Sequence, residues 1–306
     1  MDLINLHNQE NHMYRYILTT LGFFLFSATA LLAEEEGHHL SPAAVEVTKI
    51  FGFPITNSMI ISWTVTLLLV LFVRIATRNI SLVPGKMQNF VEAVIEGLYN
   101  FFTSIVGNKV IRSTFWFFSA ILIFILSTNW FSLIPGVGSI GWGYESKGEF
   151  VLLIPLLRGG NADLNLPCAM AMIFFLCWII WAFKFNGTKG IVKELFGFKG
   201  GSDIRGFLFY ILSIIFICVG FIEVISICFR PISLMFRLFG NIYAGEVMIE
   251  TLMGDLGPLK AALATLPIYF LETLVGLVQA FVFSLLTAVF TATMCSHEEG
   301  SENTAH

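Results

Sequence analysis

The sequence is poor in charged residues. Only 12% of its 306 residues are Asp, Glu, Lys or Arg, whereas 56% are hydrophobic and the mean hydropathy is +0.81. Soluble domains have roughly a quarter of their residues charged. This composition excludes an ordinary soluble protein and indicates a polytopic membrane protein. Because the few charges cluster between apolar runs, they report membrane topology, and no nucleic acid is expected as a partner.

Histidine and paired cysteine are scarce as well. All six histidines lie outside the apolar runs, so no pair of imidazoles within the membrane is available to hold haem or a metal. The five cysteines form no CxxC pair, and most lie inside apolar runs, as small buried hydrophobes do. The sequence has no HExxH motif, and a serine nucleophile would lack a histidine base. We therefore expect neither a cofactor nor a metal.

Residues 1–33 have the layout of a secretory signal peptide. Arg15 precedes an apolar run from Ile17 to Leu32, which ends in small residues and is followed by three glutamates. Cleavage would leave residues 34–57 as an external N-terminal segment. The competing interpretation is an uncleaved first membrane span. A signal peptide favours the inner membrane of a bacterium over that of an organelle.

Five later apolar segments, within a single membrane domain of residues 58–295, are each long enough to cross about 30 Å of hydrocarbon. They are Ser58 to Val73, Phe115 to Ile134, Leu166 to Phe183, Phe207 to Met253, and Ala261 to Met294. The connections after the first and third segments carry most of the basic residues, which places both connections in the cytoplasm. Five crossings then put the N-terminus outside and the tail, residues 296–306, in the cytoplasm.

The two connections that remain are external by the same rule. They are Pro135 to Asn161, which includes Arg158 among its charges, and the short turn from Asp255 to Lys260. Between Gly85 and Gly107, apolar residues recur at helical spacing opposite polar ones, which is typical of a helix that lies in the membrane interface. The expected fold is therefore all-α, with about five spans and one interfacial amphipathic helix.

The last two apolar segments are longer than a membrane is thick. As continuous helices they would measure about 70 Å and about 50 Å. Either each is broken, with Pro231 the obvious place in the first, or the two form a strongly tilted hairpin. The tilted hairpin is the arrangement that we expect.

Arg237 lies near the middle of the first of these long segments. A guanidinium at the bilayer centre costs from roughly 3 to well over 10 kcal/mol, so it normally faces a water-filled cavity or a carboxylate. At ~100° per residue, polar residues form a stripe about 80° wide along this segment. The stripe consists of Glu223, Ser226, Arg230, Ser233, Arg237 and Asn241.

Such a stripe can be an ordinary polar seam between helices, which is the interpretation that we favour for the serines. Glu223 and Arg237 need a stronger reason than packing, and Arg230 fits a position near an interface. Glu246 and Glu272 follow, with Gln279 on nearly the same helix face as Glu272. Two buried carboxylates close together could exchange protons near neutral pH, because they repel each other when both are charged. These residues predict an ion path.

The segment from Arg230 to Glu246, RPISLMFRLFGNIYAGE, resembles the signature helix of subunit a of F-type ATP synthases. The resemblance extends from about residue 45 to the end of the last span. It includes four further segments: Pro84 to Glu92, Asn161 to Asn165, Lys193 to Leu195, and Gln279 to Phe283. The sequence departs from some members in having Glu at both 246 and 272, where those members place a histidine at one of the two positions.

The resemblance implies a non-catalytic stator of a rotary motor. Two long, tilted helices would press against a rotating ring of proteolipid c subunits, with peripheral-stalk b subunits and the lipid bilayer as the other partners. Arg237 would attract a deprotonated ring carboxylate and block leakage between two offset half-channels. The resemblance implies that the entry half-channel is lined by Asn241, Glu246, Glu272, Gln279, Asp163 and Asn165. Glu223 would line the exit toward the cytoplasm.

Two other kinds of protein would also use an arginine at membrane depth. A secondary transporter would bind an anionic substrate at Arg237, although such proteins usually show internal repeats and none is found here. A structural subunit would use the polar stripe only to dock a partner. Proton flux in vesicles with and without the ring separates the three, because only a stator requires the ring. The choice between H⁺ and Na⁺, the ring size and the main direction of the enzyme remain open.

Overall fold

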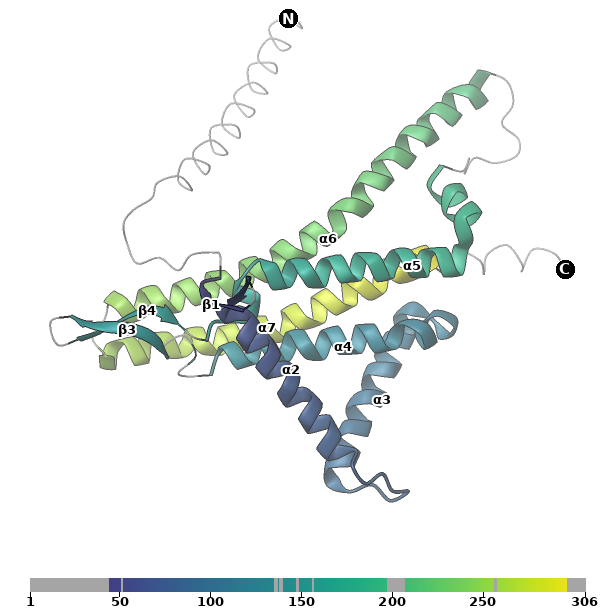
Figure 1. Cartoon of the computed structure of the whole chain (residues 1–306). Coiled ribbons are helices and arrows are strands. Elements are labelled where there is room, and N and C mark those ends of the chain that lie inside the picture. Colours follow the sequence, from purple (N-terminus) through teal and green to yellow (C-terminus); the bar gives the residue numbers. More distant parts are fainter. Residues whose placement is uncertain are drawn as a thin grey trace, which may run out of the picture. The chain divides into compact units, whose positions relative to one another are not determined.

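A computed structural model describes residues 44–50, 52–134, 137, 140–146, 149–155, 157–196, 207–255 and 258–295. The expected signal peptide, part of the external N-terminal segment and the C-terminal tail lie outside these residues. Helices make up most of the described chain (Figure 1). They are α2 (Asn57–Ala76), α3 (Lys86–Val106), α4 (Asn108–Ser132), η1 (Gly160–Ala162), α5 (Asn165–Phe196), α6 (Phe207–Asp255) and α7 (Pro258–Cys295). The expected all-α fold is confirmed.

The five predicted spans coincide with helices that are long and apolar enough to cross a membrane. These stretches are Asn57–Ala76, Asn108–Ser132, Asn165–Thr188, Ile214–Met253 and Leu263–Cys295. The amphipathic segment is helix α3, which is not among the described candidates for a span. It buries Val91, Phe102 and Val106 and exposes Phe90 and Ile95. An apolar exposed side of this kind fits the predicted place in the membrane interface.

Two short β-hairpins were not predicted. Strands β1 (Glu46–Ile50) and β2 (Phe53–Thr56) pair antiparallel just before α2. Strands β3 (Gly141–Ser146) and β4 (Glu149–Pro155) pair antiparallel within the connection between α4 and α5. Both hairpins lie in connections that the hydropathy pattern treats only as loops.

Helix α6 shows that the first of the two long segments is continuous and is not broken at Pro231. It runs for 49 residues and includes Pro231 without a break in helical structure. Neighbouring helices re-satisfy the carbonyl that a proline leaves free in a membrane helix, and Pro231 is buried. At 1.5 Å per residue α6 is about 73 Å long, and it packs against α7. The tilt of this pair in a membrane stays a prediction.

Aromatic packing joins α3, α4 and α5. Phe102 lies against Phe118, and Trp181 makes edge-to-face contacts with Phe117 and Phe118. The indole of Trp178 donates a hydrogen bond of 3.1 Å to the carbonyl of Phe290, which ties α5 to α7. Interlocked rings and bonds of this kind hold α3, α4, α5 and α7 together.

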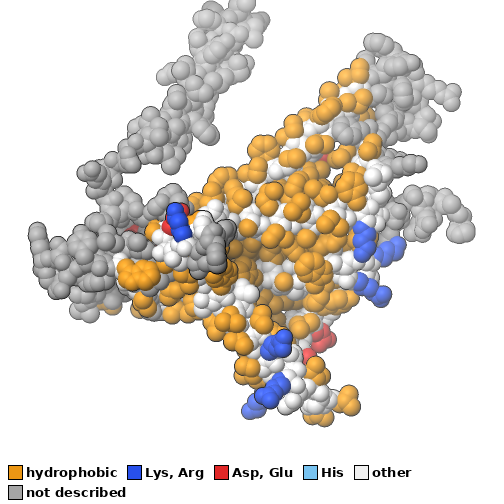
Figure 2. Space-filling model, viewed as in Figure 1, with side chains coloured by type: hydrophobic (Ala, Val, Ile, Leu, Met, Phe, Trp, Pro, Cys, Tyr) orange, Lys and Arg blue, Asp and Glu red, His pale blue; other side chains and the backbone are white. Residues whose placement is uncertain are grey.

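The outer surface is apolar over the helices. Figure 2 shows hydrophobic side chains across the visible face of the described residues, with Lys and Arg gathered around the two ends of α3. Hydroxyl groups within α2 are satisfied internally, since Ser62 and Thr66 bond to the carbonyls of Ser58 and Ser62 at 2.8 and 2.7 Å. These features are those of a multi-pass membrane protein.

Candidate functional site

Arg237 is exposed on the surface of α6. Its neighbours Leu234 and Leu238 are buried against the other helices, whereas Phe236 is 55% exposed. Among the residues that the structure describes, no carboxylate pairs with Arg237. No side chain of the described residues therefore neutralises this guanidinium, which lies on an apolar helix face.

Arg230, two turns earlier on α6, has a different environment. Its Nη2 lies 3.0 Å from Oε1 of Glu223, and its guanidinium carbon lies 4.8 Å from the ring centre of Phe290 on α7. The two arginines of the polar stripe are thus distinct. Arg230 is paired with Glu223, whereas Arg237 has no carboxylate partner among the described residues.

Asn241 and Gln279 link α6 to α7. The amide Nδ2 of Asn241 donates a hydrogen bond of 2.9 Å to Oε1 of Gln279. Gln279 is 4% exposed, and its own Nε2 is without a partner among the described residues. A buried donor without a partner lowers the stability of the fold. This amide is therefore suited to bind a bridging water or a mobile group that carries an ion.

Glu272 lies in the interface between α6 and α7. It is 4% exposed, and its Oε1 has no hydrogen-bond partner in the described structure. The carboxylate packs on the backbone of α6 at Gly245, where a Cβ would come within 2.1 Å of Oε2 and 2.3 Å of Cδ. Only a glycine allows this approach. Gly245 directly precedes Glu246 in the sequence.

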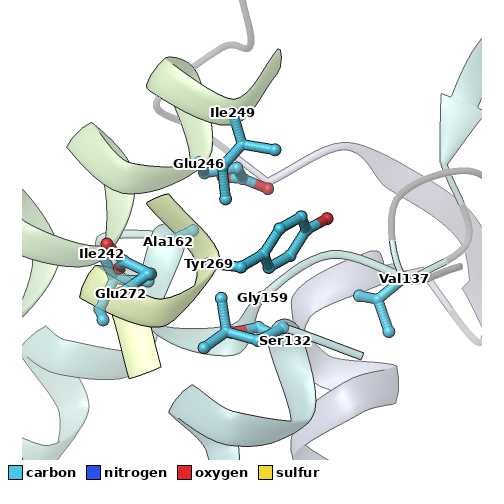
Figure 3. Close-up of a pocket in the computed structure, with 10 residues that line it drawn as sticks. Ser132, Val137, Gly159, Ala162, Ile242, Glu246, Ile249, Tyr269 and Glu272 are labelled. Atoms are coloured by element: carbon cyan, nitrogen blue, oxygen red, sulfur yellow. The ribbon is translucent and has the colours of Figure 1, made fainter. Parts of the chain in front are cut away.

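Glu246 and Glu272 line one cavity of about 80 Å³. Figure 3 shows Glu246 from α6 and Glu272 and Tyr269 from α7 around it, with Ser132 and Gly159 on the opposite side. A water needs ~10–15 Å³ of such volume, so the cavity has room for several waters. Both acids therefore line the same cavity.

Glu246 and Glu272 differ in their partners. Arg158 lies with its Nε and Nη2 both 3.2 Å from Oε2 of Glu246. From the sequence, Arg158 is expected among the charges of an external connection. In the structure its side chain is buried, with 2% exposed. Glu246 therefore has a cationic partner, and Glu272 has none among the described residues.

The backbone around Arg158 explains its burial. The connection that contains η1 packs against α2, α4, α5 and α6. A Cβ on Gly159 would lie 2.9 Å from Cβ of Ser132, and one on Gly160 would lie 3.0 Å from Oγ of Ser62. Two glycines therefore let the chain enter between the helices. Irregular backbone in a membrane protein is tolerated where other parts of the protein surround it.

Asp163 and Asn165 form a separate cluster. Ser58 on α2 donates a hydrogen bond of 2.8 Å to Oδ2 of Asp163, and Asn165 bonds to Asp163 through both its backbone and its side-chain nitrogen. Asp163 is 1% exposed. The structure does not bring this pair into contact with Glu246 or Glu272; it fastens the start of α5 to α2.

Sequence reasoning missed two further asparagine contacts. Asn161 donates to Oδ1 of Asn129 at 2.6 Å, and Asn129 donates to the carbonyl of Gly276 at 3.0 Å. Asn129 lies near the end of an apolar span, where a single amide gives little signal. In the described residues no group of three His, Cys, Asp or Glu side chains is arranged to hold a metal.

Most of this chain is similar in sequence to known proteins. The sequence model of the ATP synthase A chain matches residues 59–292. ATP synthase subunit a of Desulfosudis oleivorans is 33% identical over 78% of this chain and 88% of its own length. ATP synthase subunit a of Solidesulfovibrio magneticus is 30% identical over 79% and 86%. A sodium ion specific ATP synthase subunit a from Propionigenium modestum is 29% identical over 83% and 80%.

The chain belongs to the ATP synthase A chain family. It is a non-catalytic, multi-pass membrane subunit of F-type ATP synthase, and it translocates protons or sodium ions. As a member of the ATP synthase A chain family it is expected to act within a larger complex. The polar residues between α6 and α7 are therefore the candidates for its ion path.

Proposed function

We propose that this chain is the stator past which a ring of proteolipid c subunits rotates, with Arg237 as the fixed charge at the contact. One observation carries the proposal. Arg158 and Arg230 each pair with a carboxylate of the chain, whereas Arg237 is exposed without such a partner in the described residues. A moving carboxylate on another subunit would supply the missing counter-charge.

The entry half-channel leads to Arg237 between α6 and α7. Glu272 and Glu246 line a cavity with room for several waters, and Gln279 with Asn241 continues the polar side chains along the same helix pair. Asp163 and Asn165 lie toward the outer end, where they hold the start of α5 in place. Glu223, paired with Arg230, lies on the opposite side of Arg237 along α6 and lines the exit toward the cytoplasm.

Electrostatics couples ion flow to rotation in this arrangement. A deprotonated ring carboxylate is stable in the membrane only beside a positive charge, whereas a neutral one can face lipid. Each ring carboxylate must therefore release its ion near Arg237 and take up another before it moves into lipid. Moving one charge across 100 mV is worth about 2.3 kcal/mol, so several ions pass for each ATP made.

The complex that fits this function has further parts. Helices α6 and α7 would tilt as a hairpin along the ring, and peripheral-stalk b subunits would hold the stator. The location is the inner membrane of a bacterium, with the N-terminus outside after signal cleavage and the C-terminus in the cytoplasm. The apolar exposed faces of α2 and α3 leave surface for lipid or for such subunits.

Replacement of Arg237 tests the proposal. Arg237→Ala should abolish ATP synthesis driven by an ion gradient while the complex still assembles, because the side chain is exposed and packs little within its own chain. Arg237→Lys should fail too, since a desolvated lysine can lose its proton and lacks the planar fork of a guanidinium. ATP synthesis in inverted membrane vesicles is the measurement, with the amount of assembled complex as the control. Retained synthesis in Arg237→Ala would refute the role.

A further inference from the structure

The ion pair of Glu223 and Arg230 places two opposite charges on the part of α6 that precedes Arg237. Nη2 of Arg230 lies 3.0 Å from Oε1 of Glu223, seven residues earlier on the same helix. The guanidinium carbon of Arg230 also lies 4.8 Å from the ring centre of Phe290 on α7. Arg230 is therefore held by a carboxylate from its own helix and by an aromatic face from the neighbouring helix.

The pair lies on the same face of α6 as Arg237. Glu223, Arg230 and Arg237 follow one another at intervals of two helical turns, or about 10 Å along the helix axis. Long side chains lean toward the N-terminus of their helix, so Arg230 reaches toward Glu223 and away from Arg237. Without Glu223, this face of α6 would present two cations in succession. With Glu223, the charge of Arg230 is cancelled and that of Arg237 is not.

The surroundings of the pair are apolar. Exposed hydrophobic side chains flank it on α6, and they are Ile222, Ile225 and Phe229. The side chain of Arg230 is 23% exposed, and that of Glu223 is 50% exposed. A charge among apolar groups is screened less than a charge in open water. Removal of either partner would therefore change the electric potential along this face of α6.

We infer that the task of Glu223 is to neutralise Arg230, so that the exit half-channel carries no net charge beside Arg237, and that Glu223 does not itself carry the ion. The inference rests on the proposed function, in which an ion leaves the ring near Arg237 and passes this pair toward the cytoplasm. A bare guanidinium at this place would repel the departing cation and would compete with Arg237 for the ring carboxylate. Glu223 and Arg230 are thus positioning residues of the exit.

Charge variants of the pair test the inference by mutual rescue. In inverted vesicles with the assembled complex, Glu223→Gln should lower ion-driven ATP synthesis by about tenfold, because the charge of Arg230 is then uncompensated. Glu223→Gln combined with Arg230→Gln removes both charges and should return synthesis to within about threefold of the parent.

Salt gives a readout that a purely structural role would not change. The cytoplasmic face of inverted vesicles meets the outer medium, and the Debye length falls from about 30 Å at 0.01 M salt to about 10 Å at 0.1 M. This rise in KCl should increase synthesis by Glu223→Gln at least about twofold relative to the parent, because it screens the repulsion from Arg230. The double variant should show the same salt dependence as the parent.

Glu96 supplies the matched control. It is exposed on α3, and among the described residues it forms no ion pair. Glu96→Gln makes the same chemical change at an exposed helical position and should keep parental synthesis. Phe290→Leu removes the ring but keeps both charges, so it should also lose much less synthesis than Glu223→Gln. A loss in Phe290→Leu as large as that in Glu223→Gln would count against a role based on charge.

Three further results would overturn the inference. A double variant as inactive as Glu223→Gln, in fully assembled complexes, would mean that Glu223 itself carries the ion. Parental synthesis in Glu223→Gln, or a loss that salt does not relieve, would mean that the charge of Arg230 has no effect at the exit. A double variant that does not assemble would make the pair a folding element only.

Arg237→Ala in the same vesicles separates this inference from the proposed function. Retained synthesis in Arg237→Ala refutes the stator itself. If Arg237→Ala is blocked and the double variant is blocked as well, the stator stands and only the task assigned to Glu223 fails.

Discussion

Three arginines show how surroundings decide the role of a cation in an apolar sequence. Arg237 could be predicted from the sequence, because a cation inside a long apolar run is unusual whatever its partner. Arg158 could not, since its partner is 88 residues away and its own neighbours resemble a loop. The signal that was present is the Gly159-Gly160 pair beside it, which indicates a close approach of backbone to other elements.

Gly245 gives a sharp test at the scale of one residue. A methyl group there would overlap the Glu272 carboxylate, so Gly245→Ala should displace this acid from α6. A shift of about 1 Å in a reacting group can cost roughly tenfold or more in rate, and ion-driven ATP synthesis should fall by that amount. Glu272→Asp shortens this side chain by one methylene group. The double variant Gly245→Ala with Glu272→Asp should therefore recover part of the ATP synthesis lost in Gly245→Ala.

Gly97 supplies the matched control for this substitution. It lies inside α3, and a Cβ there would meet nothing within 4 Å. Gly97→Ala makes the same chemical change in a helix and should leave ATP synthesis unchanged. Parental activity in Gly245→Ala would show that Glu272 tolerates displacement and does not take part in ion transfer.

At the scale of elements, hydropathy predicts the helices well and the connections poorly. The five spans follow from apolar runs because every backbone group in a membrane must be bonded within its own helix. The hairpins β1–β2 and β3–β4 escaped prediction because their strands are short and lie in segments of mixed polarity. The continuity of α6 through Pro231 also depends on neighbouring helices, which the sequence of α6 alone does not contain.

The contacts of Asn129 predict how firmly α4 is held to α7. Asn129→Leu removes the bond to Gly276 and leaves the buried Asn161 amide without its acceptor. An unsatisfied buried donor costs about 1–3 kcal/mol, so the chain should be less stable by that amount. The temperature at which the chain dissociates from the detergent-solubilised complex measures this effect.

Ser119 on the same helix provides the comparison. Its Oγ is buried and has no hydrogen-bond partner in the described structure, so Ser119→Ala removes nothing that stabilises the fold. Its dissociation temperature should match that of the parent. If Asn129→Leu had the same dissociation temperature as the parent, the asparagine contacts would not hold the helices together.

At the scale of the whole molecule, the distribution of charge predicts the orientation in the membrane. Basic residues gather around the ends of α3, and the positive-inside rule places them in the cytoplasm. Leu82, before α3, and Ile140, after α4, are both exposed and should lie on opposite sides. In a variant without the five native cysteines, Ile140→Cys should react with an impermeant maleimide in intact cells, and Leu82→Cys only in inverted vesicles.

A permeant maleimide should label both positions in both preparations, which controls for reactivity. Labelling of Leu82→Cys in intact cells would reverse the predicted orientation. It would also exchange the entry and exit sides of the proposed path, because Glu223 and Asp163 lie toward opposite ends of the helices.

The position of the Arg237 guanidinium in a solved structure of the complete complex tests the central claim most directly. The distance to measure joins this guanidinium to the nearest carboxylate of the proteolipid ring. We expect about 6 Å or less in at least one rotary state, the range over which an opposite charge favours a deprotonated acid. A guanidinium that points into water, or that is paired with an acid of its own chain in every state, would contradict the account.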